Sequence, residues 1–379
     1  MKFIKPSLVC FFIICSFWSC DRKIDQPFEN LVTLERVKTI TFEIDSVTKR
    51  TSQLVGFSES TNSIYLFNDL NYVLHFFDID TQENWKSIQL YREGPMGIGK
   101  VDRLFAVSPD SIISMSSTTS RLSLITDEGQ SVKKIEVFDR DLSDPYLQTH
   151  SPSFLYDSKT QTVFLATRPG QTTPRDKASS LSTFNLVDST KKFLSPWPER
   201  FYERGVIGSI SYGSLDAYNQ YIISHTFQPE IQVVDLKSGD INKHFAGSGL
   251  VKIAEPFKGE GGLKNRGIYQ MGNSWYGNVY YDKYNDLYLR GARIGRRIPS
   301  GGDPANLSYP SLNGDKVYST TVILDKDFTK IGEVPGLRVS NQIFSTQAGI
   351  FIRNAGHQPE NEDIIAFNVF KVKQHETLD

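Results

Sequence analysis

The sequence predicts an all-β fold, a six-bladed β-propeller of four-stranded antiparallel blades, closed by an N-terminal strand that completes the last blade. The main observation is that a short apolar strand recurs six times, which indicates one supersecondary unit used six times. No helix-length stretch with a 3.6-residue period competes with this interpretation. The six recurrences are SIYLFN (63–68), SIISMS (111–116), TVFLAT (162–167), QYIISH (220–225), DLYLRG (286–291) and GIFIRN (349–354).

Each recurrence lies inside the same larger unit. A second short strand precedes it and closes on a turn of Asp, Asn, Ser or Gly type, which is typical of a β-hairpin. A third strand follows, as in VLHFFDID or EIQVVDL, and in five units a fourth, as in WKSIQL or KIGEV. The repeating unit is therefore predicted to be a four-stranded meander.

The sixth unit ends near residue 373, before its outermost strand. The segment ERVKTITFEID (35–45) precedes the first unit and reads as a lone strand. We expect it to supply the missing strand, because pairing the two ends of the chain removes the most exposed edge of the sheets.

Three stretches carry a family resemblance. IYLFN followed by VLHFFDID, and YIISH followed by EIQVVDL, resemble the second and third strands of NHL-type propeller blades. Residues 91–112, YREGPMGIGKVDRLFAVSPDSI, resemble the loop that leads into a blade in six-bladed propeller lipoproteins of Gram-negative bacteria, many of them domains of unknown function. The resemblance implies an NHL-like propeller and says little of function, since propellers host binding, scaffolding and several enzyme activities.

The N-terminus has the features of a secretory leader. Lys2 and Lys5 precede an apolar run (8–18) that is too short to span a bilayer. The stretch FWSC, ending at Cys20, resembles the lipobox of bacterial lipoproteins, in which this cysteine carries the lipid. We predict a signal peptide over 1–19, a tether over 20–33 and the propeller over 34–379, anchored as an outer-membrane lipoprotein that faces the periplasm or the cell surface. The alternative is a leader cut elsewhere, with Cys20 as a stray thiol.

Composition limits the possible functions. The formal net charge is −1, which argues against nucleic acid as a partner and leaves the lipid anchor as the contact with the membrane. Cys10, Cys15 and Cys20 are all in or next to the leader, so no disulfide or thiolate site is expected in the propeller. The sequence contains no HExxH motif, and the glycines of GPMGIGK (94–100) are followed by Val101 where a P-loop needs Ser or Thr. We expect neither a cofactor nor a metal site.

The candidate ligand site lies where the longest predicted loops leave the ring. In units three to five, the connections on one face are much longer than the turns on the other, and long loops on a rigid scaffold commonly carry function. Arginines gather there, and their planar donors suit carboxylate, phosphate or sulfate. The predicted ligand-binding residues are Arg168, His225, Arg290, Arg293, Arg296, Arg297, Arg353 and Asn354. Alternatively, the arginines pair with Asp303, Asp315, Glu360 or Glu362, or are solvated.

Two functions remain open from the sequence. The first is a binding or scaffold protein for an anionic glycan, peptide or protein partner. The alternative is an extracytoplasmic hydrolase or lyase with its site at the channel mouth. An enzyme of that kind needs converging acids or a metal set, and the aligned strand ends contain no Asp or Glu. Aromatic residues at 275–284 could stack on sugar rings, or serve as core between blades.

Overall fold

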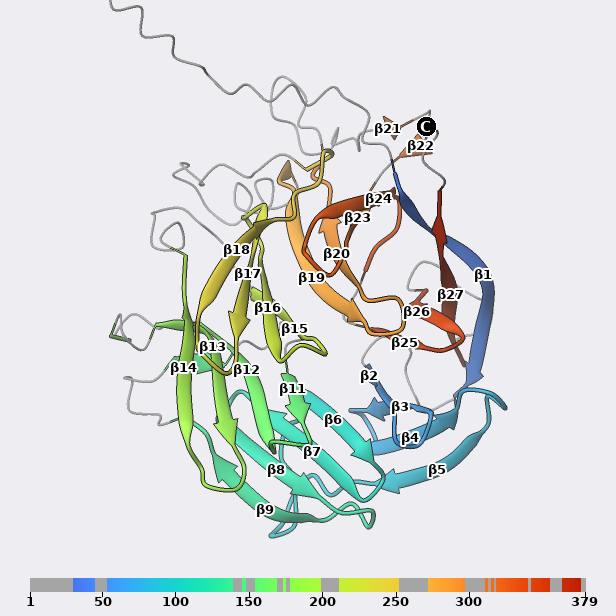
Figure 1. Ribbon diagram of the computed structural model, residues 1–379. Coiled ribbons are helices and arrows are strands. Elements are labelled where there is room, and N and C mark those ends of the chain that lie inside the picture. The colour runs from blue at the N-terminus through green and yellow to red at the C-terminus, as the bar shows by residue number, and fades with distance from the viewer. Residues whose placement is uncertain are drawn as a thin grey trace, which may run out of the picture.

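The computed structural model describes residues 30–44, 53–138, 145–147, 154–168, 173–174, 178–198, 211–251, 272–296, 311–312, 315–316, 318–339, 342–354 and 363–375. Six antiparallel sheets stand around a common axis, and each contains one copy of the predicted four-stranded meander (Figure 1). The prediction of a six-bladed β-propeller is confirmed. The predicted leader, with Cys20, lies outside the described residues.

The first three blades follow the chain in order, from the innermost strand outward. Blade 1 contains β2 (Gln53–Ser58), β3 (Ser63–Asn68), β4 (Val73–Asp78) and β5 (Asn84–Gln89). Blade 2 contains β6 (Arg103–Ser108), β7 (Ser111–Ser116), β8 (Arg121–Ile125) and β9 (Ser131–Glu136). Blade 3 contains β11 (Phe154–Asp157), β12 (Thr162–Arg168), β13 (Ser179–Asn185) and β14 (Lys191–Pro196), and the short β10 (Tyr146–Leu147) also pairs with β12.

The remaining blades repeat the pattern. Blade 4 contains β15 (Ser211–Leu215), β16 (Gln220–His225), β17 (Glu230–Asp235) and β18 (Ile241–Phe245). Blade 5 contains β19 (Trp275–Asp282), β20 (Leu287–Arg293), β23 (Ser319–Leu324) and β24 (Lys330–Pro335). A small hairpin, β21 (Ser311–Leu312) with β22 (Asp315–Lys316), lies in the connection between β20 and β23. Blade 6 contains β25 (Ile343–Thr346), β26 (Gly349–Arg353), β27 (Ile364–Gln374) and β1 (Val32–Glu43).

The turns between first and second strands share one local conformation. The residue just before the second strand has a positive φ in blades 1, 3, 4 and 5, at Asn62, Gln161, Asn219 and Asp286. Asn and Asp tolerate this left-handed conformation better than most residues, which explains the polar turn chemistry seen in the sequence. The tight turn then brings the strands back in antiparallel register.

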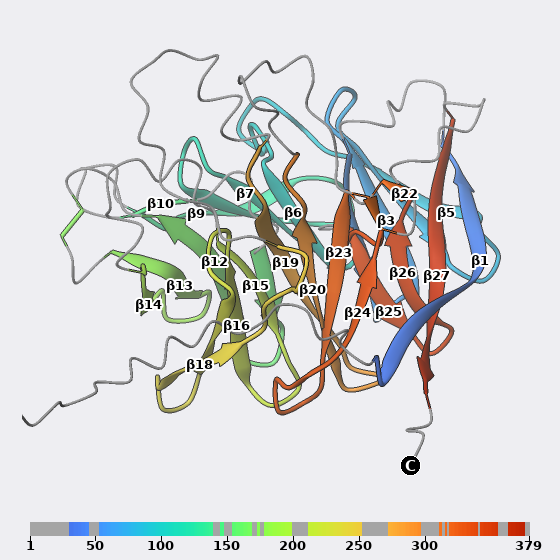
Figure 2. The same cartoon turned by 90° about the horizontal axis from the view of Figure 1, so that it is seen from above.

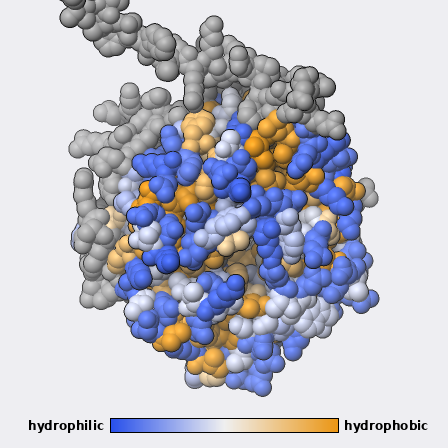
Figure 3. All heavy atoms as spheres, in the orientation of Figure 1, coloured by the Kyte–Doolittle hydropathy of each residue, from blue (hydrophilic) through white to orange (hydrophobic). Residues whose placement is uncertain are grey.

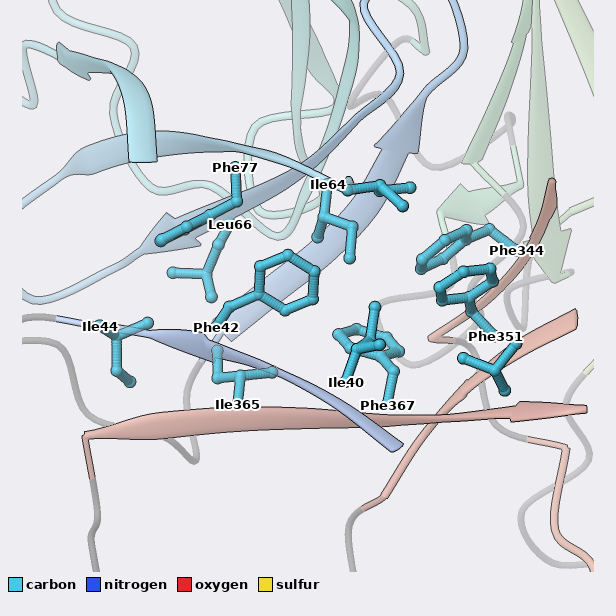
Figure 4. Packing of buried hydrophobic residues seen from close by; sticks show 12 residues of the cluster. Ile40, Phe42, Ile44, Ile64, Leu66, Phe77, Phe344, Phe351, Ile365 and Phe367 are labelled. Atoms are coloured by element: carbon cyan, nitrogen blue, oxygen red, sulfur yellow. The ribbon is translucent and has the colours of Figure 1, made fainter. Parts of the chain in front are cut away.

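The ring is closed as predicted. β1 pairs antiparallel with β27, from Val32 opposite Gln374 to Glu43 opposite Ile364. Its apolar residues, among them the almost fully buried Phe42, pack between blades 6 and 1 (Figure 4). Phe42 makes edge contacts with Phe77 of blade 1 and Phe367 of blade 6, with ring centroids 5.7 and 6.1 Å apart. The closing strand is therefore held by core packing as well as by the backbone ladder.

The two ends of the ring differ. The long-loop face carries the connections from second to third strands and from each fourth strand to the next blade, and it includes Tyr91–Asp102 and Ala246–Val251. The short-turn face carries the other connections and the end of β27. Figure 2 shows the ring from the side, with the long-loop face upward. Within the described residues, no helix is long and apolar enough to cross a membrane.

Candidate functional site: the central channel

A cavity runs along the axis of the ring between the innermost strands. One lobe, here called the Asn278 lobe, measures about 290 Å³ and is lined by strands of blades 2 to 6. The second, the Arg103 lobe, measures about 170 Å³ and is lined mainly by blades 1, 2 and 6. Both lobes are lined by Phe105, Leu155 and Ile343, so they adjoin. In Figure 3, which looks along the axis from the short-turn face, apolar residues show through at the centre of a largely hydrophilic rim.

The Arg103 lobe lies toward the long-loop face, because Arg103 begins β6 and Gln342 directly precedes β25. Arg103 is the one charged side chain among the described residues that line either lobe. Its Nη1 donates to the backbone carbonyl of Asp102 at 2.6 Å, and its burial lowers the pKa of the guanidinium, against the opposing charge of Asp102. A guanidinium with this apolar wall behind it can bind an anion that enters the channel.

The carboxylate of Asp102, the residue before Arg103, is held by other groups of the protein. Its Oδ2 accepts from the amide and hydroxyl of Ser117 at 2.8 and 2.5 Å, and its Oδ1 lies 3.0 Å from Lys100 Nζ. Burial alone would raise the pKa of Asp102, but these bonds outweigh it and the pKa is lowered. The carboxylate therefore stays ionised and fixes the start of β6 to the turn after β7.

Gln342 connects the lobe to one of the predicted arginines. Arg353, at the end of β26, donates from Nη1 to Gln342 Oε1 at 2.7 Å, and the two backbones are also bonded. Arg353 is thus placed behind a residue that lines the channel. Asn354 follows it, and the backbone N–H of Asn354 donates to the carbonyl of Ala366 at 2.9 Å.

The Asn278 lobe is mostly apolar and contains one unusual polar group. Asn278 is only 7% exposed, and its Oδ1 has no hydrogen-bond partner within the described part of the chain. It lies in a bulge of β19: Tyr276 pairs with Ala292 and Val279 with Arg290, so Gly277 and Asn278 together oppose one residue. Bulges re-aim side chains and are over-represented beside active sites. An unpartnered buried amide oxygen on a cavity wall is costly for folding and marks a candidate ligand contact.

Arg290 lies in the interior and not at the channel. It is fully buried, and its pKa is lowered to about 10, chiefly by burial. Its guanidinium donates to the Ser224 hydroxyl, to backbone carbonyls in the β16–β17 turn and at the start of β17, and to one after β18. The acceptors are Ser224, Gln228, Pro229, Glu230 and Ala246. Its five donors are engaged by the protein, so the structure offers this arginine a role in joining blades 4 and 5. It gives no support to the predicted ligand contact.

His225 is also buried, at 3% exposure. Its Nε2 lies 3.2 Å from Gln232 Oε1, which also accepts from Ser195, and its ring is 5.5 Å from that of Trp197. Burial lowers its pKa to about 4, with a smaller contribution from the charge of Arg290 and an opposing one from Gln232. The imidazole is therefore neutral at pH 7 and unable to attract an anion by charge.

The other predicted residues lie at the long-loop ends of second strands. Arg293 lies over the indole of Trp275 with its Cζ 4.3 Å from the ring centroid, and it is half-buried like Arg296. Arg168 is exposed at the end of β12, in a different blade. Arg297 lies outside the described residues. The described residues of this group share one face but belong to blades 3, 5 and 6, and binding of a ligand by them stays a prediction.

The predicted aromatic cluster divides between core and contact surface. Tyr276 and Tyr281 are buried, Trp275 and Tyr280 are half-buried, and Tyr284 is exposed. The hydroxyl of Tyr280 donates to Ser345 at 2.9 Å. The core alternative thus describes Tyr276 and Tyr281, but not the whole cluster. Tyr280 and Tyr281 nevertheless line the Asn278 lobe. Within the described residues, no group of three or more His, Cys, Asp or Glu side chains is placed to hold a metal ion.

Sequence reasoning missed Arg103 and Asn278, the two polar residues that distinguish the channel. The prediction aligned the ends of the second strands, whereas the channel is lined by the first strands. An alignment of first strands would have shown Arg103 as a charged residue at the start of an otherwise apolar strand, RLFAVS. The bulge at Asn278 had no such signal, because NVYYDKYN alternates like an ordinary strand.

These features define a class of protein, a six-bladed β-propeller with a ligand-sized cavity on its axis. Residues 30–335 match the family DUF4221, described as a domain of unknown function, and the chain belongs to this family. A crystal structure of a DUF4221 member from Bacteroides vulgatus is 21% identical, with a TM-score of 0.68 over 91% of this chain and 99% of that one. A putative exported protein from Bacteroides fragilis is 10% identical, with a TM-score of 0.53 over 91% and 96% of the two chains. These likenesses show the fold. No curated protein matches the sequence.

Proposed function

We propose that this protein is a binding protein, anchored by a lipid outside the cytoplasm, that takes an anionic group of a glycan, peptide or protein partner into the long-loop end of its channel. The observation that carries the proposal is the Arg103 lobe. A guanidinium lies there at the mouth of an apolar cavity, and no Asp or Glu is among the described lining residues.

The geometry supports binding in two ways. The apolar walls exclude water around the guanidinium, which strengthens its attraction for an anion relative to the same pair in bulk solvent. The larger lobe, at about 290 Å³, is near the lower end of the range of roughly 300–1,000 Å³ typical of small-molecule sites. Gln342 beside Arg103, with Arg353 behind it, adds donors at the same mouth.

The test compares Arg103→Gln with wild-type protein on an array of acidic glycans and of peptides with free or amidated carboxyl groups. We expect Arg103→Gln to weaken binding of the anionic probes by roughly 10- to 100-fold, because a hydrogen bond to a charged group contributes about 1.5–3 kcal/mol. Arg121→Gln is the matched control, since it removes the same charge from an exposed site in the same blade, where Arg121 pairs with Glu136. Equal binding by wild type and Arg103→Gln would overturn the proposal.

Two further measurements belong to this proposal. Ligand recovered unchanged after incubation supports a binding protein, whereas cleaved ligand would favour the hydrolase or lyase alternative. Mass spectrometry of the mature N-terminus tests the anchor: a diacylglyceryl group on Cys20 is expected, and a Cys20→Ser variant should lose it and leave the membrane fraction.

A further inference from the structure

We infer that the Asn278 lobe receives a large apolar residue of an extended peptide, whose backbone amide hydrogen-bonds to the Asn278 side chain. This inference rests on the proposed function and narrows its ligand class to peptides. It starts from a contrast within one cavity. Most of the wall is apolar or aromatic, with Phe105, Leu155, Leu215, Val279 and Ile343, while one buried amide oxygen, Asn278 Oδ1, lacks a partner within the described part of the chain.

The state of Asn278 is unusual for a residue that serves folding alone. A buried amide without a hydrogen bond costs about 1–3 kcal/mol, and native structures contain few such groups. The neighbouring polar side chain, Ser214, already accepts from the backbone amide of Tyr281 at 3.1 Å. Asn278 is brought to this position by a bulge that disrupts the β19–β20 ladder. The unpartnered oxygen and the interrupted ladder both lower the stability of the fold. Such local losses of stability are expected at residues that serve binding.

The amide suits a peptide backbone. A primary amide offers an acceptor and two donors, and rotation of its plane exchanges oxygen and nitrogen at a given position. An extended residue presents its own N–H and C=O on the same edge of the chain, which a primary amide can match with one bond or two. Recognition of main-chain groups combined with a pocket for a side chain is a recurring mode of peptide binding.

The rest of the lobe selects the side chain. A dry apolar cavity of about 150 Å³ is large enough to bind benzene, so about 290 Å³ accommodates a Leu- or Phe-sized side chain with its peptide unit. A sugar ring fits the chemistry less well, because each buried hydroxyl needs a partner or costs about 1–3 kcal/mol. The described wall offers few free polar groups besides Asn278 and the Tyr156 hydroxyl.

The adjoining Arg103 lobe indicates which further group the peptide ligand should carry. Since the two lobes have Phe105, Leu155 and Ile343 in common, a peptide with its apolar residue in the larger lobe extends toward the guanidinium. The favoured ligand is therefore a peptide that carries a large apolar residue close to a carboxylate.

The experiment measures fluorescence anisotropy of labelled tetrapeptides with Leu, Phe, Ala or Lys at one position and a free or amidated carboxyl end. Wild-type protein should bind the Leu and Phe peptides at least tenfold more tightly than the Ala and Lys peptides. Asn278→Leu, which keeps the size of the side chain and removes its hydrogen bonds, should weaken binding of the Leu and Phe peptides by roughly tenfold. Asn242→Leu, on the outer strand β18, is the matched control and should bind as wild type.

Folding is checked in the same variants. Asn278→Leu should unfold at the same temperature as wild type or higher, because it replaces an unpartnered buried amide with an apolar group of similar volume. A variant that binds less but is no less stable separates recognition from a structural role. Should Asn278→Leu fail to fold, Asn278→Ser, which keeps a hydrogen-bonding group, is measured instead and should retain part of the binding.

The outcomes distinguish the two proposals. Binding that depends on Arg103 but is indifferent to Asn278 and to the apolar residue would overturn the peptide inference and leave the anionic-ligand proposal standing. Asn278-dependent peptide binding that is unchanged in Arg103→Gln would overturn the anionic-ligand proposal alone. Preference for a glycan over every tetrapeptide, or no tetrapeptide binding at millimolar concentration, also overturns the inference.

Discussion

Arg290 lies across the ring of Tyr276, with its Cζ 3.9 Å from the ring centroid, and the pair joins blade 5 to the carbonyls of blade 4. Both side chains are almost fully buried. The ring face and the backbone carbonyls stabilise the guanidinium. Among the described residues, no carboxylate is close enough to form an ion pair with it. A buried cation held in this way is a structural element whose removal leaves several acceptors unsatisfied.

Replacing Arg290 should therefore destabilise the protein strongly. We expect Arg290→Met to lower the free energy of unfolding by about 3–5 kcal/mol, because carbonyls of the β16–β17 turn lose their donors. Urea unfolding followed by tryptophan fluorescence measures the change. Arg293→Met is the control: its side chain is half-buried over Trp275, and the loss there should be about 1 kcal/mol or less. Similar losses in both variants would contradict the structural role assigned to Arg290.

His225 predicts a dependence of stability on pH. Its pKa is about 4 in the folded protein, against an ordinary value of 6.5, because burial disfavours the charged ring. The unfolded chain therefore binds the proton first as the pH falls. The contribution of His225 to the free energy of unfolding is complete above pH 6.5 and is lost as the pH falls toward 4, by up to about 3 kcal/mol.

The measurement is urea unfolding of wild type and His225→Gln at pH 7.5 and at pH 4.5. The glutamine variant cannot take up this proton, so its loss of stability between the two pH values should be smaller than that of wild type by about 2–3 kcal/mol. Parallel losses in the two proteins would mean that His225 is not held neutral in the fold.

The closing strand gives a third prediction. Phe42 is 2% exposed between blades 6 and 1, and Phe42→Ala should cost about 3–5 kcal/mol through the lost burial and the cavity left behind. Phe245 is 56% exposed on the outer strand of blade 4, so Phe245→Ala should change stability by no more than about 0.5 kcal/mol. The midpoints of chemical unfolding compare the two. A small effect at Phe42 would show that the seam is held by the backbone ladder and not by the core.

The architecture could be predicted because its strands and turns follow from local sequence patterns. Alternation with period 2 and the polar turn before each second strand predict the hairpins, and the incomplete sixth unit predicts the closing strand. Even so, β1 begins at Val32, inside the segment assigned to the tether. Its first residues pair with the end of β27, and such a long-range pairing has no local signal.

The site was predicted less well, for physical reasons. Arg290 lies in a second strand, and the sequence predicts that the ends of these strands reach the channel mouth. The direction of its guanidinium is set by the carbonyls of the β16–β17 turn. These carbonyls come close to Arg290 only when blades 4 and 5 pack together. Asn278 depends on a bulge, and Arg103 on the identity of the strand that lines the channel. These are relations between blades, so a pattern along one strand does not contain them.

The seam between β1 and β27 also sets the order in which the molecule can form. Val32 pairs with Gln374, so β1 obtains its partner only after the strands of the other five blades have been made. Until then its apolar side, with Ile40 and Phe42, has no sheet to cover it and is open to association with other chains. Assembly of the ring is thus a late event, and we expect a chain of this design to benefit from a holding chaperone during synthesis.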